Sequence, residues 1–597
     1  MINLSTQTDL IPEITLSEHV MLLEDGTELF YRAWIPSEPT RKSLIIFHRG
    51  HEHSGRLEDV VRGLHLRGVA VFAWDARGHG LSGGPRGYAS TFGQITRDAD
   101  EFIRHISTNH GMPLQDMVVL GHSVGAVTVS AWVHDYAPQI RAMVLVTPAL
   151  RVRLYVPFAR QFLRLLRILS RRKPRFVSSY VKGRLLTHDE EQAQKYDEDP
   201  LISRTIAVNI LLGLHDTATR LIADAGAIRT PTLMLAGGSD WVVDLKAEQE
   251  FFNRLGSTIK RMRVFDGMHH DILHEKDRRA VLNDIRVFLC GAFARDQIVP
   301  DTDDETYTRH EYDRLCAPLP RFSTKRLWFA LQSAFLKTYG RLSEGIRIGW
   351  KAGFDSGSSL DYVYENRARG SLLLGRIIDR GYLDQPAWAG IRQRKINLEK
   401  LLREAIEEMI ERGAKPHILD VATGQGRYVL DTIAQLSDKS VTAVLRDYSL
   451  TNVEAGRALA SQRHIDGVTF EQADAFDPGS YESLTRAPNI AVVSGLLELF
   501  PDNTPARRCL GGLADEMEEG GYLVYTGQPW HPQIEMIARV LTNREGKPWI
   551  MRRRTQRELD ELVREAGFEK IKTLVGGRGI FTVSIAVRRR TIERESR

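Results

Sequence analysis

The sequence predicts two α/β domains in one chain, and three observations support this fold class. Short apolar runs of strand length alternate with helical patterns between residues 43 and 265, and the alternation returns after residue 417. Both stretches contain a strand, a glycine-rich turn and a helix in succession, at residues 117–134 and 417–429. A chain of 597 residues is also too long to fold around one core.

The composition is that of an ordinary globular protein. Apolar residues make up 42% and charged residues 26% of the chain, and a net charge of +5 is too small over this length to predict a nucleic-acid partner. The three cysteines, Cys290, Cys316 and Cys509, lie far apart in the sequence. They predict a reducing compartment and offer no spacing for a metal site.

Two patterns that would direct a chain to or across a membrane are not visible. Residues 1–24 lack a charged segment followed by an apolar one, so no signal peptide is expected. No apolar run approaches the roughly 18–20 residues that span a bilayer. We therefore expect a cytoplasmic protein.

The first domain is expected at residues 1–297. Its strands are predicted at residues 43–47, 69–74, 117–120, 142–146, 232–236 and 261–265. Most of these runs end in polar or glycine-rich segments, which is where ligand-binding loops of an open α/β sheet occur.

One of these segments matches the pattern of a nucleophile elbow. Gly121-His122-Ser123-Val124-Gly125 follows a strand and precedes a helix-forming segment, the context in which G-x-S-x-G exposes a reactive serine. A second match, around Ser82, lies in a loop and is followed by Gly-Pro-Arg-Gly, which does not favour a helix. The context selects Ser123.

Two further residues complete a possible triad. A serine nucleophile needs a base to take its proton and a carboxylate to orient that base, and in α/β-hydrolases Asp and then His follow the serine, each after a strand. Asp240 and the pair His269 and His270 occupy these places. Alone, such an aspartate is often a turn residue, but three placements in order predict a triad. The residues themselves do not separate His269 from His270.

This segment resembles the monoacylglycerol lipase and lysophospholipase branch of the α/β-hydrolases. The resemblance rests on four motifs, at residues 48–55, 75–82, 121–125 and 267–270. It implies that the base is the third residue after Gly267, which is His270, and that the N–H groups of Gly50 and Val124 form the oxyanion hole. One departure is Arg49, which stands where the family usually has glycine.

A helical cap is expected over this site at about residues 150–228, where the strand pattern stops. The segment from Arg151 to Arg175 contains nine Lys or Arg and no acid. An apolar stripe recurs in it at helical spacing, formed by Phe158, Phe162, Leu165 and Leu169. The pattern fits a cationic helix resting on anionic lipid at the inner membrane face, or a solvated helix packing its stripe on the hydrolase core.

Residues 298–395 are expected to form a linker and then a helical connector or lid. Residues 301–305 are a short acidic stretch typical of a linker. Helical patterns and a glycine-serine loop follow. A structural connector is the simpler interpretation, and a substrate-binding lid for the next domain is the functional alternative.

The second domain is expected at residues 396–597. Residues 417–429 predict a strand, a glycine turn and a helix, the nucleotide-binding geometry of a doubly wound sheet. Val429 stands where a third glycine would be, which disfavours a dinucleotide. Asp447, about twenty residues further on, ends the next strand and can accept hydrogen bonds from two ribose hydroxyls.

This domain resembles the Rossmann-like class I S-adenosylmethionine-dependent methyltransferases over nearly its whole length. Their first motif maps to Asp420, Gly424 and Gly426, the ribose acid to Asp447 and the adenine-side acid to Asp474. The resemblance implies S-adenosyl-L-methionine as the cofactor.

The segment after the fourth strand of this domain bears on the methyl acceptor. It lacks Asn-Pro-Pro-Tyr, the motif of enzymes that methylate amino groups of nucleic acids, and residues 494–500 resemble the small-molecule methyltransferases instead. Glu498 fits a general base, although a solvent-facing helix residue is the better interpretation. Methyl transfer from a sulfonium often needs only proximity and alignment.

The entire chain resembles bacterial fusions of a lysophospholipase-like hydrolase with a methyltransferase. We therefore expect a serine hydrolase acting on a carboxylic ester, a lysophospholipid or monoacylglycerol, joined to a methyltransferase with a small-molecule or lipid acceptor. Two alternatives stay open. The same triad supports an acyltransferase if the cap excludes water, and the second domain could be a sensor that binds S-adenosylmethionine without transferring methyl.

Overall fold

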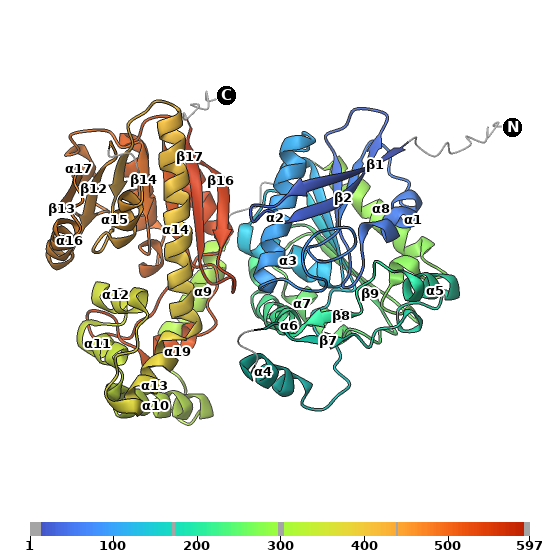
Figure 1. Cartoon of the computed structure of the whole chain (residues 1–597), viewed down its shortest axis with the longest axis horizontal. Helices are drawn as coiled ribbons and strands as arrows, with labels where there is room; N and C mark the ends of the chain where they lie inside the picture. The colour runs from blue at the N-terminus through green and yellow to red at the C-terminus, as the bar shows by residue number, and fades with distance from the viewer. Residues whose placement is uncertain (1–13, 170–172, 296–303, 437–439, 590–597) are drawn as a thin grey trace. The chain divides into compact units, whose positions relative to one another are not determined.

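The computed structural model describes residues 14–169, 173–295, 304–436 and 440–589. The chain divides into two compact units, residues 1–301 and 302–597, and each unit has its own α/β sheet (Figure 1). Of the predicted linker, residues 301–303 lie outside the described residues. The helix α9 (Asp304–Cys316) begins directly after them.

The first unit is built on an eight-stranded sheet in the order β1-β2-β4-β3-β5-β6-β9-β10. Its strands are β1 (Ile14–Leu22), β2 (Glu28–Pro36), β3 (Ser43–Phe47), β4 (Ala70–Trp74), β5 (Met117–His122), β6 (Ala142–Val146), β9 (Thr232–Gly237) and β10 (Lys260–Phe265). β2 pairs antiparallel with β1 and β4, and the strands from β4 to β10 are parallel. Every predicted strand is present, and the hairpin of β1 and β2 is additional.

Helices cover both faces of this sheet. They are α1 (Glu58–Gly63), α2 (Phe92–Asn109), α3 (Val124–Tyr136), α7 (Leu245–Arg254) and α8 (Arg279–Ala294). α1 and α8 pack on the face that carries Leu44 and Ile46. Phe102 of α2 packs on Phe47 and Trp74, which point to the opposite face because successive strand side chains alternate. The strands of this sheet are apolar on both sides because helices bury both faces of the sheet.

The chain between β6 and β9 is mainly helical, as predicted for a cap. It contains α4 (Ala159–Leu169), α5 (Glu190–Glu198) and α6 (Val208–Ala223), with a two-stranded antiparallel ribbon of β7 (Phe176–Ser178) and β8 (Thr205–Ala207). α4 is attached to α6 through Leu163, which packs with Val208 and Leu212. In Figure 1, α4 lies at the edge of the unit, away from the sheet.

The second unit is built on a seven-stranded sheet in the order β13-β12-β11-β14-β15-β17-β16. Its strands are β11 (His417–Asp420), β12 (Thr442–Asp447), β13 (Val468–Gln472), β14 (Ile490–Val493), β15 (Tyr522–Gly527), β16 (Phe568–Val575) and β17 (Thr582–Arg588). The strands are parallel except β17, which is antiparallel to both its neighbours. The predicted doubly wound fold with a closing hairpin is confirmed.

Both faces of this second sheet are also covered. α14 (Pro386–Glu411), α15 (Arg427–Ala434) and α16 (Leu450–Gln462) share one hydrophobic cluster with the strands. α18 (Thr504–Glu516) and α20 (Gln556–Glu565) share a second cluster on the other face, and the short helix α17 (Pro478–Glu482) packs beside α18.

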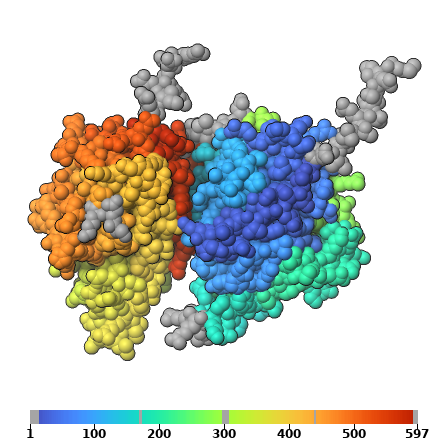
Figure 2. Space-filling model, turned by 45° about the horizontal axis from the view of Figure 1, so that its top comes forward, coloured from blue at the N-terminus to red at the C-terminus, as the bar shows by residue number. Residues whose placement is uncertain are grey.

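The helices that precede α14 belong to this second unit. They are α10 (Thr324–Lys337), α11 (Glu344–Ala352), α12 (Gly357–Glu365) and α13 (Leu372–Leu383), and they meet the later helix α19 (Ile534–Val540) in a separate aromatic-rich cluster. Figure 2 shows this segment, in yellow, as one continuous block at the surface of the unit. Among the described helices of both units, none combines the length and apolar character needed to cross a membrane.

Candidate active sites

Ser123 lies at the turn between β5 and α3. Its backbone φ of 55° and ψ of −109° are unusual for a residue with a side chain. The turn requires its flanking glycines, because a Cβ on Gly121 would lie 2.5 Å from the Cα of Ala126 and a Cβ on Gly125 would lie 2.3 Å from the carbonyl oxygen of Phe47. The strained geometry is that of a nucleophile elbow.

The structure brings Ser123, His270 and Asp240 together. His270 Nδ1 lies 2.7 Å from Asp240 Oδ2, and His270 Nε2 lies 2.8 Å from Ser123 Oγ. An ionised carboxylate only accepts hydrogen bonds, so Nδ1–H donates to Asp240 and Nε2 accepts from the serine hydroxyl. Ser123 is 5% exposed and His270 2% exposed, so water has little access to the pair.

Asp240 is held in its ionised form. Burial alone would raise the pKa of its carboxyl, but the charge and hydrogen bond of His270 outweigh this effect, and the pKa lies below its usual value. Its second oxygen accepts hydrogen bonds from the N–H groups of Val242 at 2.6 Å and Val243 at 2.8 Å. The carboxylate is therefore both charged and fixed in orientation.

The two alternatives to these residues lie elsewhere. The ring of His269 stacks on His188 with centroids 3.8 Å apart, and His269 makes no contact with Ser123 among the described interactions. Ser82, the serine of the second G-x-S-x-G match, is buried and donates to the carbonyl of Asp75 at 2.5 Å. It also accepts from the N–H of Phe30 at 2.8 Å, so its hydroxyl links strand β2 to the residue that follows β4.

The two predicted oxyanion donors are neighbours. Val124 is the first residue of α3, so its N–H is one of the groups that a helix cannot satisfy internally. A Cβ on Gly50 would lie 3.1 Å from Cγ2 of Val124, which brings the Gly50 backbone to the same turn.

Arg49, the departure from the family pattern, occupies a buried ionic cluster. Its Nε lies 3.2 Å from Glu52 Oε2 and 3.4 Å from Asp271 Oδ2, with all three side chains almost fully buried. Its guanidinium lies 4.4 Å from the ring centre of Tyr196, a cap residue. Arg49 directly precedes Gly50, and Asp271 directly follows His270, so the cluster joins two loops of the site. Sequence inspection did not find this role, because Asp271 reaches Arg49 only through the fold.

Two groups of side chains have the spacing of metal ligands, although the sequence predicted no metal. They are His188, His269 and Glu275, and the buried set Glu52, Asp271 and His274, with the ligand atoms of each group within 4.8 Å of one another. In the second group Glu52 and Asp271 already face Arg49, so a cation there would have to displace an arginine.

A cavity of about 650 Å³ is lined by residues of α4, of α6 and of the segment that follows β6, and Ser123 is not among its lining residues. Ala149, whose N–H donates to the Ser123 carbonyl at 3.1 Å, is one of its lining residues. The remaining wall is part apolar and part basic, and includes Leu150, Leu163, Leu211 and Leu212 with Arg151, Arg153 and Arg160. The mixture suits a ligand with an apolar chain and a polar head.

The apolar stripe predicted in the cap faces solvent. Phe158 is 78% exposed, Phe162 59% and Leu165 52%, while the side chain of Leu169 lies outside the described residues. α4 uses the intervening Leu163 to pack on α6. The stripe is therefore not packed on the hydrolase core, which contradicts the second of the two interpretations.

In the second unit, the predicted cofactor loop lies between β11 and α15. Gly424 has a φ of +60° and its N–H donates to Asp447 Oδ2 at 2.9 Å. Gly426 has a φ of +69° and directly precedes α15. Gly424, Asp447 and Asp474 line one cavity of about 1250 Å³. The structure thus brings residues from the ends of three strands to a common space.

Asp420 occupies a different place from the other predicted cofactor residues. It is fully buried below the loop, and it is not among the residues that line the cavity. Burial raises the pKa of its carboxyl to about 7, although the hydroxyl of Tyr428 donates to it at 2.6 Å. Asp420 is placed to support the loop from beneath.

The helical segment predicted as a connector or lid lines this same cavity. Arg427 of α15 forms an ion pair with Asp361 of α12, with Nε 2.9 Å from Oδ1, and both residues line the cavity. Trp328, Phe335 and Tyr382 line it as well. The segment therefore contributes part of the wall of this cavity.

Glu498 differs from its expected position. It lies in the short turn η7 (Leu497–Leu499) and is 8% exposed, so the preferred interpretation as a solvent-facing residue is wrong. It lines the cavity, and its Oε1 lies 3.4 Å from Nη1 of Arg394 in α14. This burial could not be inferred from the sequence, because Arg394, the partner of Glu498, lies in a helix far away in the chain.

Known proteins agree with this two-part organisation. A family model described as "Putative methyltransferase" matches residues 285–588, about half of the chain. The chain belongs to this family. A second model, described as "Serine aminopeptidase, S33", matches residues 38–277 of this methyltransferase-family protein.

Individual relatives match either the whole chain or its first unit. YnbC of Escherichia coli K12, described as an uncharacterized protein, is 46% identical over 580 residues, which cover 96% of this chain and 98% of the relative. A monoacylglycerol lipase of Mycolicibacterium smegmatis is 27% identical over 45% of this chain and 96% of its own length. Human monoglyceride lipase is 27% identical over 42% of this chain and 82% of its own length. The first unit is therefore an α/β-hydrolase related to monoglyceride lipases, fused to a methyltransferase-family domain.

Proposed function

We propose that the first unit hydrolyses carboxylic esters and that the second unit transfers methyl groups from S-adenosyl-L-methionine. The hydrogen-bonded chain from Ser123 Oγ to His270, at 2.8 Å, and on to Asp240, at 2.7 Å, carries the first proposal. It links a nucleophile, a base and an orienting carboxylate within one buried site.

In this mechanism Ser123 Oγ attacks the ester carbonyl carbon while its proton passes to His270 Nε2. Asp240 keeps the Nδ1 proton in place and stabilises the imidazolium that forms. The N–H groups of Gly50 and Val124 donate to the oxygen that becomes negative in the tetrahedral intermediate. His270 then gives its proton to the leaving alcohol, and a water activated by the same imidazole releases the acid.

The substrate we propose is an ester of one acyl chain with a polar head, a monoacylglycerol or a lysophospholipid. The cavity between α4, α6 and the segment after β6 has a volume of about 650 Å³, within the range of about 300–1,000 Å³ typical of small-molecule sites. Its leucines suit the chain, and Arg151, Arg153 and Arg160 suit a phosphate or glycerol head. The relatives named monoglyceride lipase support the same class.

We also propose that α4 brings the first unit to anionic lipid. Phe162 and Leu165 are exposed on this helix, and Phe158, which directly precedes it, is exposed as well. The side chain of Arg164 is 57% exposed beside them, in a segment without acidic residues. Apolar side chains flanked by cations are the pattern of helices that lie in a membrane interface.

Labelling with a fluorophosphonate probe tests the catalytic serine. We expect Ser123→Ala to abolish labelling of the full chain, because the probe reacts only with an activated serine hydroxyl. Ser82→Ala is the matched control, since it removes the other G-x-S-x-G serine, and its labelling should stay at the wild-type level per folded molecule. Persistent labelling of the Ser123 variant would contradict the assignment of Ser123 as the nucleophile.

Product analysis separates hydrolysis from acyl transfer. Wild-type protein would be given monoacylglycerols, lysophospholipids and short-chain esters, with and without added glycerol. Hydrolysis predicts free acid with a yield independent of glycerol. A new acyl-glycerol product that replaces the acid would instead favour the acyltransferase alternative.

For the second unit, the residues at the cavity fit S-adenosyl-L-methionine. Asp447 can accept from the ribose hydroxyls and Asp474 can accept from the adenine amino group, while Gly424 lets the backbone approach the ligand. Gly426 lets the turn pack on the sheet, because a Cβ there would lie 2.7 Å from Cδ1 of Leu445. The positive φ of both glycines supports this, since a side chain there would be strained. When bound, the cofactor supplies an electrophilic methyl group.

Calorimetric titration of the full chain with S-adenosylmethionine tests this second proposal. Saturable binding is expected, and Asp447→Ala should weaken it about tenfold or more, because a hydrogen bond to a charged acceptor is worth about 1.5–3 kcal/mol. Methyl label would then be followed into lipid and metabolite extracts. Binding without movement of the label would favour the sensor alternative, and no binding would contradict the proposal.

A further inference from the structure

The cavity of the second unit is larger than a cofactor site alone. Its volume of about 1250 Å³ exceeds the range of about 300–1,000 Å³ found for sites that hold one drug-sized molecule. The cofactor loops supply only part of its lining, and the rest comes from α10 to α14, α19 and the segment around Trp549. Space therefore remains for a second ligand, and we call the part lined by these helices the acceptor chamber.

The walls of the acceptor chamber are mainly aromatic and aliphatic. Trp388 and Trp549 stack with ring centres 6.4 Å apart and planes 23° apart. Phe354 and Phe581 belong to the same cluster, and both line the cavity. Such walls favour an apolar ligand, because its transfer from water contributes roughly 25 cal/mol for each Å² of apolar surface that is buried.

One ion pair interrupts these apolar walls. Arg394 and Glu498 have side chains 7% and 10% exposed, and their 3.4 Å contact is longer than the 2.7–2.9 Å usual for charge-assisted hydrogen bonds. It is the one side-chain hydrogen bond of Glu498 within the described part of the chain. The carboxylate has two oxygens and accepts up to about four hydrogen bonds, so it retains capacity for a ligand donor.

Arg394 is fixed beside the turn at the end of β14. Its guanidinium lies 5.1 Å from the ring centre of Phe581, and a Cβ on Gly495 would lie 3.3 Å from its Nη2. The ion pair is thus at the carboxyl edge of the sheet, which is also where β11 and β12 present the cofactor loops. Ligands of open α/β sheets bind at this edge.

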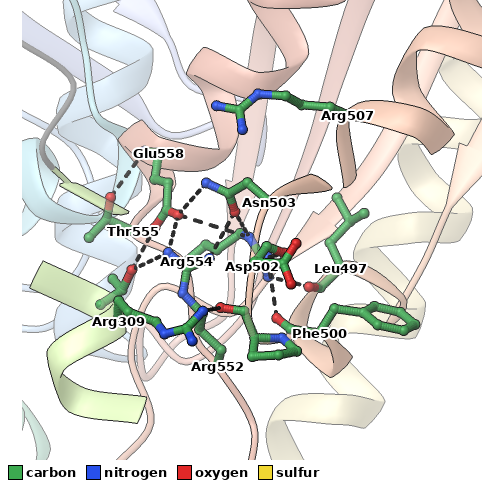
Figure 3. Close-up of polar contacts among 12 residues, drawn as sticks. Arg309, Leu497, Phe500, Asp502, Asn503, Arg507, Arg552, Arg554, Thr555 and Glu558 are labelled. Atoms are coloured by element: carbon green, nitrogen blue, oxygen red, sulfur yellow. Dashed lines mark hydrogen bonds and ion pairs between the residues drawn. The ribbon is translucent and has the colours of Figure 1, made fainter. Parts of the chain in front are cut away.

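The turn that carries Glu498 is held by buried arginines, and Figure 3 shows Arg554 beside Leu497 and Phe500 of this turn. The backbone N–H of Arg552 donates to the Glu498 carbonyl at 3.2 Å. Arg554 donates to the carbonyls of Leu497, Phe500 and Asp502, the last at 2.8 Å. A turn held by these hydrogen bonds fixes the position of the Glu498 side chain, as a catalytic group requires.

We propose that the acceptor chamber binds an apolar alcohol or phenol, with Glu498 accepting its hydroxyl proton and Arg394 donating a hydrogen bond to its oxygen. The proposal rests on the methyltransferase function proposed above. A hydroxyl is both donor and acceptor, as the pair requires. A carboxylate ligand would meet the like charge of Glu498, and an ammonium ligand would meet that of Arg394.

The reaction balances with these residues. The hydroxyl oxygen forms the new bond to carbon with a lone pair, and its proton moves to Glu498. S-adenosylmethionine, when bound, would supply the methyl group, and the electron pair of the broken carbon–sulfur bond would stay on its sulfur, which would become neutral. Arg394 holds the hydroxyl oxygen in place and stabilises the negative charge that develops on this oxygen during the transfer.

Binding of 4-nitrophenol and 4-nitroanisole, measured without cofactor by quenching of tryptophan fluorescence, tests the proposal. The two probes differ only in whether the oxygen carries a proton or a methyl group. We expect wild type to prefer the phenol by about tenfold or more below the pKa of the probe, since a hydrogen bond to a charged group is worth about 1.5–3 kcal/mol. Affinity for the phenol should fall as it ionises, because phenolate and Glu498 repel.

Glu498→Gln makes the test specific. With the negative charge removed, Arg394 faces the ligand unopposed, so affinity should rise rather than fall as the phenol ionises. Glu518→Gln, an exposed carboxylate in a turn of the same unit, is the matched control and should behave as wild type. A purely structural effect of Glu498 would weaken binding at every pH without reversing its slope.

The same variants then distinguish the chemistry by activity. Glu498→Gln should lose methyl transfer to weakly acidic phenols and retain most of it with phenols already ionised at the assay pH. No saturable binding of 4-nitrophenol, equal affinity for the two probes, or an unchanged pH slope in Glu498→Gln would each overturn the proposal. Failure of the underlying function appears separately, as absent binding of S-adenosylmethionine in the titration described above.

Discussion

At the scale of single residues, Arg49 links the loop that contains Gly50 to the loop that contains His270. Its guanidinium contacts two buried carboxylates, Glu52 and Asp271. Breaking a buried ion pair from one side leaves an uncompensated charge and costs about 3–5 kcal/mol. We expect Arg49→Met to lower the free energy of unfolding of the first unit by this amount in urea titrations. The variant should also hydrolyse esters more slowly, because Gly50 directly follows Arg49 and His270 directly precedes Asp271.

Arg62→Ala is the control for Arg49→Met. Arg62 pairs with Glu58 on an exposed helix face, with side chains 50% and 41% exposed. Exposed pairs of this kind contribute about 0–1 kcal/mol. Equal destabilisation by the two variants would show that the buried Arg49 cluster contributes no more to stability than an exposed ion pair.

The same cluster predicts how the first unit responds to acid. Burial alone would raise the pKa of Glu52, but Arg49 and Arg56 outweigh it and lower the pKa to about 2, from a usual value of 4.5. A carboxyl with a lowered pKa in the folded state stabilises the fold above its unfolded pKa and loses this contribution as the pH falls through its folded pKa. The stabilisation should therefore decline between about pH 4.5 and pH 2.

Circular dichroism in the near ultraviolet, followed during acid titration, measures this loss. In Arg49→Met the pKa of Glu52 should rise, so the acid transition should begin at a higher pH than in wild type. An identical midpoint in both proteins would rule out the Arg49 cluster as the cause of the transition.

The sequence predicted the positions of some of these residues and not of others. Ser123 and Asp240 could be placed because each follows an apolar run that is recognisable locally, whereas His270 was selected over His269 only by the resemblance to the lipase family. Arg49 was noticed as a departure, but its partner Asp271 could not be inferred, since only the fold brings them together. For the same reason the burial of Glu498 was missed.

At the scale of elements, α4 has two faces with different roles. Leu163 attaches it to α6, whereas Phe162 and the directly preceding Phe158 remain exposed beside arginines. Burying a phenylalanine side chain contributes about 1.5–3 kcal/mol. We expect the double variant Phe158→Ser, Phe162→Ser to bind vesicles of phosphatidylglycerol and phosphatidylcholine at least tenfold more weakly than wild type in co-sedimentation.

A matched control and salt complete this experiment. Phe322→Ser removes a fully exposed phenylalanine from the second unit and should leave vesicle binding unchanged. Wild-type binding should weaken as salt rises, because the arginine contribution is screened. Equal binding by the double variant and wild type would exclude α4 as the lipid-contacting element.

The elements differ in how visible they were in the sequence. Runs such as β3 and β6 are apolar throughout, so their bounds could be read directly. β1 was not recognised, because it is a half-exposed edge strand in which polar residues interrupt the apolar pattern. Residues 328–339 were recognised as helical, whereas α12 begins within the stretch that was read as a glycine-serine loop. The role of this segment in lining a cavity depends on contacts with α19 and α14 that no local pattern encodes.

At the scale of the whole molecule, the segment of residues 298–395 changes its interpretation. The sequence suggested a connector between two domains, whereas the described part of it packs with the second unit and shares a hydrophobic cluster with Ile537 and Phe581. The chain therefore has two hydrophobic assemblies, each organised around its own sheet. Both sheets could be predicted from sequence motifs, because each motif consists of a strand and a turn that are adjacent in the sequence.

Separate sheets and cores predict two transitions when the full chain is unfolded in a scanning calorimeter. A ligand that binds only the native state stabilises it by RT ln(1 + [L]/Kd), about 2.7 kcal/mol at a hundredfold excess over Kd, which raises a midpoint by several degrees. We expect S-adenosylmethionine to raise one midpoint and leave the other unchanged. Arg49→Met should lower only the transition that the cofactor does not move. A single transition that both changes shift together would mean that the two units unfold as one cooperative body, despite having separate cores.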